Sequence, residues 1–195
     1  HMPSKPRHED PEEIILAAAR RCYLEDGIRN TGMKEVAQAA NVARSTLYRY
    51  YPSRDDVLVA VVKREMEATN AVIRRKLQRY EQPADIIVEG LLLALQEIPR
   101  RPILQAVFAS EEDSRARRAI WESDTIEQFG EQLLEHVIQP AQEMGILQDR
   151  VRPEIMVEWV YRTLISLLTL PSNWTRSDKD LRLMLHALLV PVLLR

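Results

Sequence analysis

The chain has 195 residues, enough for one or two small domains with a buried core. Its net charge of −2 excludes a generally basic nucleic-acid binder, and its single cysteine, Cys22, excludes a disulfide within the chain. Only 5 glycines and long apolar runs with helical spacing favour an all-helical protein. The longest uncharged stretches, Thr163 to Thr175 and Leu183 to Leu194, are shorter than the roughly 20 apolar residues of a membrane-spanning helix.

The first predicted helix follows a polar tail. Residues 1–9 are expected to be flexible, and His1-Met2 resembles a cloning remnant. Asp10-Pro11-Glu12-Glu13 is typical of a helix start, with a capping Asp, Pro at the first position and Glu at the third. The helix is expected to run to about Glu25, and Gly27 ends it. Cys22 falls on its apolar side and is expected to be a buried small hydrophobe.

Residues 33–54 predict a helix-turn-helix motif. Thr31 or Gly32 opens a helix that ends at Ala40, and a second helix runs from about Arg44 to Tyr50. Asn41 lies at the turn, where it tolerates the left-handed conformation better than any other non-glycine residue. Small or apolar residues occupy the positions where the two helices would cross: Val36, Ala37, Ala40, Leu47 and Tyr51.

The outward side of the second helix carries groups that suit base edges and phosphates. These residues are Arg44, Ser45, Thr46, Tyr48, Arg49 and Tyr50. Residues 1–54 carry 9 basic and 7 acidic side chains, whereas residues 55–195 carry 18 and 22. A basic head on an acidic body fits a protein that touches DNA with one end.

The residues of this motif resemble the N-terminal domain of the TetR family of transcriptional regulators over roughly residues 10 to 60. The resemblance rests on Gly27, Thr31, Val36-Ala37, Val42, Thr46-Leu47-Tyr48, Tyr50-Tyr51 and Pro52-Ser53-Arg54. Two positions depart from the family pattern. Asn41 replaces the usual turn glycine, and Ala43 replaces the usual capping serine, which weakens the start of the second helix by about 1 kcal/mol.

The resemblance implies roles for these side chains. Arg44 would contact a guanine or, equally, a phosphate. Thr46, Tyr48 and Tyr50 match positions that usually bind phosphates, and Lys34 matches one that contacts a base or a phosphate. Arg54 follows the Pro-Ser turn, where the family usually places a lysine on the DNA backbone. The expected DNA-binding residues are Thr31, Lys34, Arg44, Ser45, Thr46, Tyr48, Arg49, Tyr50 and Arg54.

The rest of the chain predicts a second, helical domain. Ser53 caps a long helix that reaches about Tyr80 and links residues 10–53 to residues 54–195. Further helices are expected at 83–98, through Phe108, from Ser123 to near Gly145, at 153–170 and at 178–194, with Pro191 kinking or ending the last one. The charged stretch Glu111 to Arg118 predicts a loop with a helical turn. About nine helices result, the number typical of the family.

In this family the second domain holds a ligand cavity among its helices. Phe108, Trp121, Phe129 and Trp159 are the candidate lining residues, although each also fits a core position. Glu158 and Arg162 interrupt the apolar helix 153–170, so they either form a structural pair or meet a ligand carboxylate. The expected effector is a mostly apolar small molecule with one acidic or polar group.

The last two predicted helices are apolar on more than one side, which predicts a homodimer interface. The candidate interface residues are Trp159, Leu164, Leu168, Leu181, Leu185, Leu188 and Leu189. The alternative is that both helices form the core of a monomer. Against it, these helices end the chain, and TetR-like proteins pair them with their two-fold mates in a four-helix bundle.

No catalytic pattern is present in the sequence. His136 and His186 are far apart and have no cysteine partner, and no glycine-rich phosphate loop or Ser-His-Asp order occurs. We therefore expect no enzyme, no metal and no cofactor. The resemblance implies a homodimeric, ligand-released repressor that binds a near-palindromic operator in double-stranded DNA, in the bacterial cytoplasm and with no membrane contact. A regulator controlled by a protein partner, or a helical ligand-binding protein with a vestigial head, are the alternatives.

Overall fold

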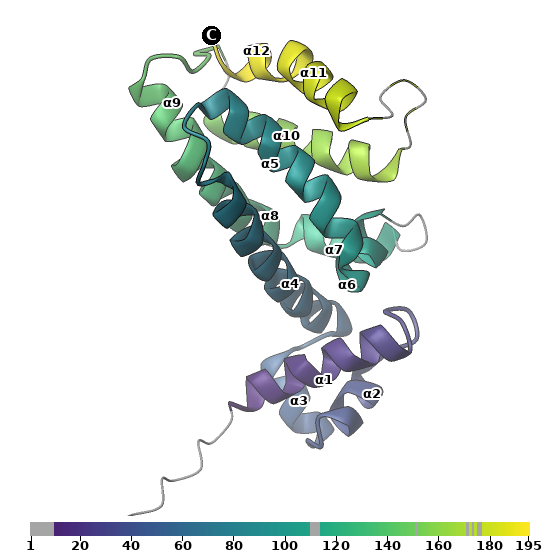
Figure 1. Ribbon diagram of the computed structural model, residues 1–195. Coiled ribbons are helices and arrows are strands. Elements are labelled where there is room, and N and C mark those ends of the chain that lie inside the picture. Colours follow the sequence, from purple (N-terminus) through teal and green to yellow (C-terminus); the bar gives the residue numbers. More distant parts are fainter. Residues whose placement is uncertain (1–9, 110–113, 151, 171, 173, 175–176) are drawn as a thin grey trace, which may run out of the picture. The chain divides into compact units, whose positions relative to one another are not determined.

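A computed structural model describes residues 10–109, 114–150, 152–170, 172, 174 and 177–195 (Figure 1). The expected tail, residues 1–9, lies outside these ranges. The described residues are helical, and their one β interaction is an isolated bridge between Leu147 and Leu194. The all-α class is thus confirmed. Within the part that is described, no helix is both long and apolar enough to cross a membrane. The chain divides into two compact units, His1–Arg64 (unit 1) and Glu65–Arg195 (unit 2).

Unit 1 contains α1 (Pro11–Glu25), α2 (Met33–Ala39), α3 (Arg44–Tyr50) and the first part of α4 (Arg54–Leu77). The start of α1 forms as the sequence predicts, because the Asp10 carboxylate accepts a hydrogen bond from the Glu12 N–H at 3.1 Å. The chain leaves α1 through Gly27, which has a φ of 83°, a left-handed conformation that glycine adopts without strain. At the start of α4, the Ser53 N–H and hydroxyl both donate to the Asp56 carboxylate.

The core of unit 1 is made by one side of α1, the crossing of α2 and α3, and the beginning of α4. Its fully or nearly buried side chains include Ile15, Ala18, Ala19, Cys22, Tyr23, Val36, Ala37, Leu47, Val57, Leu58, Val61 and Val62. The burial of Cys22 is as expected. The Tyr51 hydroxyl donates to the Glu12 carboxylate at 2.7 Å and so ties the end of α3 to α1. Burial, helped by this bond, raises the pKa of Tyr51.

Unit 2 contains the rest of α4 and the helices that follow it. The longer ones are α5 (Pro83–Glu97), α7 (Ser114–Glu122), α8 (Thr125–Leu133), α10 (Pro153–Thr169) and α11 (Asp178–Leu188). The shorter ones are η1 (Ile98–Arg100), α6 (Pro102–Leu104), η2 (Gln105–Ala109), η3 (Leu134–Ile138), α9 (Gln139–Glu143) and α12 (Val190–Leu193). Its core gathers apolar residues of α5, α10 and α11, with Ile73 of α4 and residues 137 and 141.

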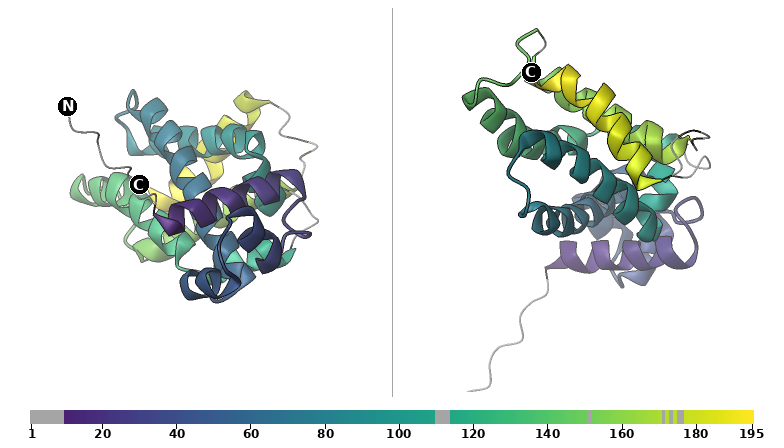
Figure 2. Two further views of the ribbon diagram at one scale, coloured as in Figure 1. Left: turned by 90° about the horizontal axis from the view of Figure 1, so that it is seen from below. Right: turned by 45° about the horizontal axis from the view of Figure 1, so that its top comes forward.

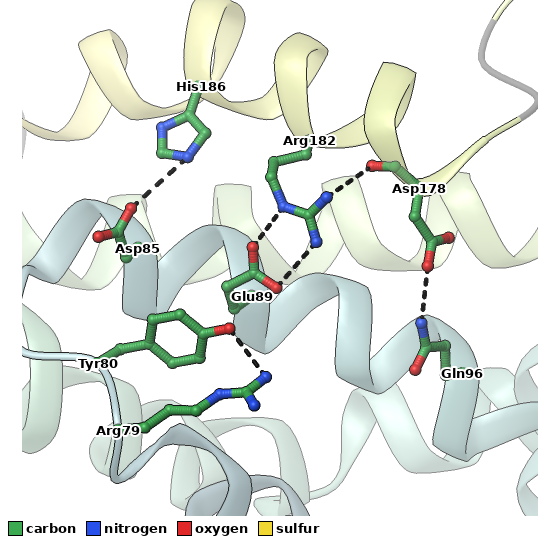
Figure 3. Close-up of polar contacts among 8 residues, drawn as sticks. All are labelled: Arg79, Tyr80, Asp85, Glu89, Gln96, Asp178, Arg182 and His186. Carbon is green, nitrogen blue, oxygen red and sulfur yellow. Dashed lines mark hydrogen bonds and ion pairs between the residues drawn. The ribbon is translucent and has the colours of Figure 1, made fainter.

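Helix α11 lies along α5 (Figure 2), and a row of polar contacts joins the two helices (Figure 3). Arg182 donates two hydrogen bonds to the Glu89 carboxylate, one of them at 3.1 Å. Gln96 donates to Asp178 at 2.9 Å, and His186 Nε2 lies 3.7 Å from Asp85 Oδ1. The bonds from Arg182 are the main reason why the pKa of Glu89 lies below its ordinary value.

Two elements differ from the sequence expectation. A regular helix, α7, replaces most of the expected loop, because Ala116 and Ile120 are four residues apart and both are buried. Residues 111–113 of that stretch lie outside the described ranges. The last helix ends at Leu188, and Pro191 lies at the start of the separate α12, as its missing N–H requires.

Candidate DNA-binding surface and ligand cavity

The turn between α2 and α3 brings the two helices together at small side chains. Asn41 has a φ of 53°, which confirms the left-handed turn predicted at this residue. The next residue, Val42, donates its N–H to the Ala37 carbonyl at 3.0 Å and closes the turn. Ala37 and Leu47 are both buried, so α3 is held against α2 on its apolar side. Its opposite side is left for a partner.

That opposite side of α3 carries polar side chains. Arg44, Ser45, Tyr48 and Arg49 are exposed, while Thr46 and Tyr50 are half-buried. The Arg49 guanidinium lies 5.4 Å from the centre of the Tyr50 ring, a cation–π contact. No side chain caps α3, as expected for Ala43 at that position. The arrangement presents guanidinium, hydroxyl and phenol groups on one short helix, the chemistry that DNA base edges and phosphates accept.

The three expected DNA-binding residues outside α3 lie in different surroundings. Lys34 is exposed on α2. Thr31 is only 1% exposed, and its hydroxyl donates to the Gly27 carbonyl at 2.9 Å, so it shapes the turn that precedes α2. Arg54 is half-buried and donates one hydrogen bond to the Ile28 carbonyl. The guanidinium has further N–H groups that can donate to another acceptor. Thr31 therefore serves the fold of unit 1, whereas the Lys34 side chain is exposed to solvent.

A cavity of about 490 Å³ lies within unit 2. This volume is within the range of small-molecule sites. The second part of α4, α5, the segment from α8 to η3, and α10 contribute its wall. The apolar lining residues are Ile73, Leu77, Ile86, Ile87, Gly90, Leu91, Ala94, Phe129, Leu133, Val137, Val160 and Leu164. The polar ones are Asn70, Arg74, Gln78, Tyr80, Gln132, His136 and Tyr161.

Of the four candidate lining residues from the sequence, Phe129 lies on this wall. Phe108 is buried away from it, and Trp159 is half exposed on α10. Trp121 lies beneath the guanidinium of Arg162, 5.1 Å from the ring centre. Arg162 also forms an ion pair with Glu158 on the surface, as expected if these two residues are a structural pair. Sequence reasoning missed Tyr161 and the polar residues of α4, because nothing local in the chain separates them from ordinary surface residues.

The candidate interface residues divide into buried and exposed sets. Leu164, Leu185 and Leu189 are buried in the core of unit 2 itself, and Leu168 and Leu181 are partly buried against it. Trp159 is 50% exposed and Leu188 is 69% exposed. Further large apolar side chains are exposed on the same helices and on α12: Ile155, Leu183 and Val192. A single chain thus buries some of the apolar side chains of these helices in its core and leaves the others in contact with water.

The chain is similar to known proteins both in sequence and in fold. The family model for bacterial regulatory proteins of the tetR family matches residues 15–61. The HTH-type transcriptional regulator Rv1255c of Mycobacterium tuberculosis is 29% identical over 186 residues, which is 95% of this chain and 87% of the relative. Its length is thus largely shared with this chain.

Solved structures share the fold. The Thermus thermophilus FadR, a TetR family transcriptional repressor in complex with lauroyl-CoA, superposes with a TM-score of 0.66 at 22% identity, over 92% of this chain and 94% of that one. RolR in complex with resorcinol superposes with a TM-score of 0.68 at 16% identity, over 94% of this chain and 87% of that one. The arrangement of helices is therefore that of proteins with a helix-turn-helix head and a helical second domain.

Proposed function

Because the chain belongs to the TetR family of transcriptional regulators, we propose that it is a repressor that a small, mostly apolar molecule releases from DNA. One observation carries the proposal. A single helix, α4, begins in unit 1 directly after α3 and residues 51–53, and it supplies Asn70, Arg74 and Leu77 to the cavity wall. A ligand in the cavity therefore touches the same helix that begins in the DNA-binding unit.

The DNA-binding end of the proposal rests on α3. Arg44 at its start and Lys34 of α2 are each assigned to a base edge or a phosphate, and Tyr48 is assigned to a phosphate. All three are exposed. A helix of seven residues reaches only a few base pairs, so a specific site needs two copies of α3. A two-fold axis relating the copies accounts for a near-palindromic operator.

The dimer is assigned to the apolar side chains that α10, α11 and α12 leave exposed. Trp159, Leu183 and Leu188 are large and face water in a single chain, although unit 2 already has a complete core without them. Large apolar side chains that stay exposed on three consecutive helices favour a protein contact. Leu185 and Leu189 support the interface from beneath, as part of the core that positions the exposed residues.

Release from DNA is assigned to the cavity. A ligand shifts a regulator only if it binds one conformation better than the other. Here the ligand would favour a position of α4 in which the two copies of α3 no longer match the spacing of the operator half-sites. Lauroyl-CoA and resorcinol, which the similar FadR and RolR structures contain, differ greatly in size, so the fold alone does not select the ligand. The chemistry of this cavity must do so.

A regulator controlled by a protein partner is the second candidate. It would need no internal ligand site, and its second domain would be expected to pack solidly. A cavity of about 490 Å³ favours the small molecule instead. The exposed polar side chains of α3 likewise argue against a vestigial head.

A reporter gene behind the operator tests repression, once the operator has been selected from random DNA. Expression of the protein should lower reporter output, and higher output would identify an activator. A thermal-shift screen of lipophilic acids, sterols and hydrophobic drugs tests the effector. Stabilisation by members of these classes is expected, because a bound ligand raises the melting temperature. Hits confined to sugars, nucleotides or metal ions would refute an apolar effector.

A further inference from the structure

The polar groups of the cavity come mainly from two helical stripes. Asn70, Arg74 and Gln78 follow one another at intervals of four residues and so share one side of α4 and the turn after it. Gln132 in α8 and His136 in η3 have the same spacing. The Arg74 guanidinium donates a hydrogen bond to Gln132 Oε1 at 2.7 Å, which brings the two stripes together.

These stripes form the mouth of the cavity. Arg74, Gln78 and His136 are exposed, whereas Ile87 and Phe129 on the wall are buried. The other apolar lining residues come largely from α5 and α10, which form the core of unit 2. The cavity therefore has polar groups at the solvent side and apolar side chains inside, which suits an amphiphilic ligand.

The charge at the mouth is positive. None of the lining residues is acidic, and no carboxylate among the described residues pairs with Arg74. Arg74 donates to a neutral amide oxygen, so its charge is not compensated. A ligand carboxylate or phosphate would compensate it and would accept two hydrogen bonds from the guanidinium.

The neighbouring groups add hydrogen-bond donors. His136 Nδ1 lies 2.9 Å from the Gln132 carbonyl oxygen, to which it must donate. The amide N–H groups of Gln132 remain free when its oxygen accepts from Arg74. Tyr161 lines the cavity, and its hydroxyl has no hydrogen-bonded partner among the described residues. Burial raises the pKa of Tyr161, which keeps this hydroxyl protonated and able to donate.

We propose that the cavity binds an amphiphile with an apolar chain and an anionic head, a carboxylate or a phosphate, and that the head pairs with Arg74 at the mouth. The chain lies against the buried wall formed by α5, α10 and Phe129. The inference rests on the proposed function only in treating the cavity as the effector site. A cationic amphiphile is disfavoured, because it would place a like charge beside Arg74 with no acid on the wall to offset it.

Calorimetric titration of the full chain tests this with four ligands of one chain length: decanoate, decyl phosphate, decanol and decyltrimethylammonium, with each ionic ligand below its micelle concentration and decanol below its solubility limit. At least one anion should bind about tenfold more tightly than decanol, and the cation should bind more weakly than decanol. The tighter of the two anions identifies the head as carboxylate or phosphate. Arg74→Gln should lower the affinity for that anion about tenfold and leave decanol binding unchanged, which also shows that the cavity is intact.

Arg75→Gln is the matched control. Arg75 is the next residue of α4, is exposed, and does not line the cavity, so anion binding should be unchanged. Equal affinity for all four heads, no binding of either anion, or unaltered anion affinity in Arg74→Gln would overturn the inference. Operator affinity is measured on the same samples. A protein that binds its operator but neither anion contradicts only this inference, and one that binds the anion through Arg74 but no DNA contradicts only the proposed function.

Discussion

The α3 surface and the cavity mouth both present polar side chains to water, but they hold them differently. On α3, the side chains of Arg44, Ser45 and Tyr48 have no hydrogen-bonded partner among the described residues. At the cavity mouth, Arg74 is bonded to Gln132. The first arrangement leaves groups ready for a large, uniformly charged partner, whereas the second sets one cation in place for a ligand of defined size. We therefore expect that variants of the α3 surface in unit 1 and of the cavity in unit 2 will change DNA binding and ligand binding separately.

The largest expected effect comes from separating the two copies of α3. Leu188→Glu places a charge on a side chain that is 69% exposed in the single chain, so unit 2 should still fold. The dimer should dissociate, and operator affinity should fall about a hundredfold or more, because the second α3 no longer binds intramolecularly. Sedimentation velocity and operator titration measure both effects.

Leu24→Glu is the control for this experiment. Leu24 is also an exposed leucine, at 41%, but it belongs to α1 in unit 1, so the variant should remain dimeric. A Leu188→Glu protein that stays a dimer would place the interface elsewhere. Glutamate at Leu185 is a poorer test, since that side chain is 1% exposed and the variant should misfold.

Arg44→Ala should separate the functions of the two units. We expect it to cost about 1–3 kcal/mol of operator affinity and to relax the choice of base at one position in each half-site. Tyr48→Phe should weaken binding to all sequences alike, because a phosphate contact carries no base information. Fluorescence anisotropy with the operator and its single-base variants distinguishes these patterns. Unchanged operator affinity in Arg44→Ala would remove Arg44 from the DNA-binding surface.

Glu89→Gln should destabilise the helices around the cavity without touching DNA contacts. The Glu89 side chain is 14% exposed, and losing its charge should lower the free energy of unfolding by about 1–3 kcal/mol at pH 7. The exposed pair of Arg162 and Glu158 provides the control, and Glu158→Gln should cost less than about 1 kcal/mol. Urea unfolding followed by circular dichroism compares the two variants.

The cost of Glu89→Gln should also depend on pH. The pKa of Glu89 is lowered in the folded state, so its ionised form stabilises the fold at pH values above the unfolded pKa of about 4.3. That stabilisation is lost as the pH falls through the lower, folded pKa. The difference between wild type and variant should therefore shrink towards acid pH, and a difference that stays constant would exclude the charge as its cause.

The smallest effect is expected at the turn between α2 and α3. Asn41 adopts a φ of 53°, so Asn41→Ala should lower the free energy of unfolding by about 1 kcal/mol. Asn41→Gly meets no such strain and should be close to neutral. Thermal unfolding of the two variants measures this. Equal stability of the alanine and glycine variants would mean that the left-handed turn is not a constraint on the fold.

The same contrast explains what the sequence reveals. The DNA-binding motif occupies one continuous stretch, so turn chemistry at Asn41 and the alternation of small, apolar and polar residues could be recognised there directly. The cavity collects Arg74, Gly90, Gln132 and Tyr161 from four segments of the chain, and each alone looks like an ordinary helical residue. Aromatic residues predicted the cavity wall poorly, because Trp121 packs against the Arg162 guanidinium and Phe108 is buried elsewhere in the protein.

Helix periodicity likewise predicted that the last helices carry apolar side chains on more than one side. It did not predict which of these side chains lie in the core and which face water. Leu185 and Leu188 are three residues apart in one helix, yet the first lies in the core of unit 2 and the second faces water. Only the packing of α11 on α5 decides this, and that packing is fixed by distant residues such as Glu89 and Arg182 (Figure 3). Sites built from tertiary contacts therefore required the structure.

The most direct test of α3 as a DNA-reading surface is the selection of double-stranded DNA from a random pool by the 195-residue chain. We expect enrichment of a near-palindromic sequence, with two half-sites about one helical turn or a multiple of it apart, because two copies of α3 would bind across a two-fold axis. Pools selected by Arg44→Ala should be less restricted at one position of each half-site. A wild-type pool that stays random, from protein that is folded and dimeric, would contradict the assignment of α3 as the DNA-reading surface.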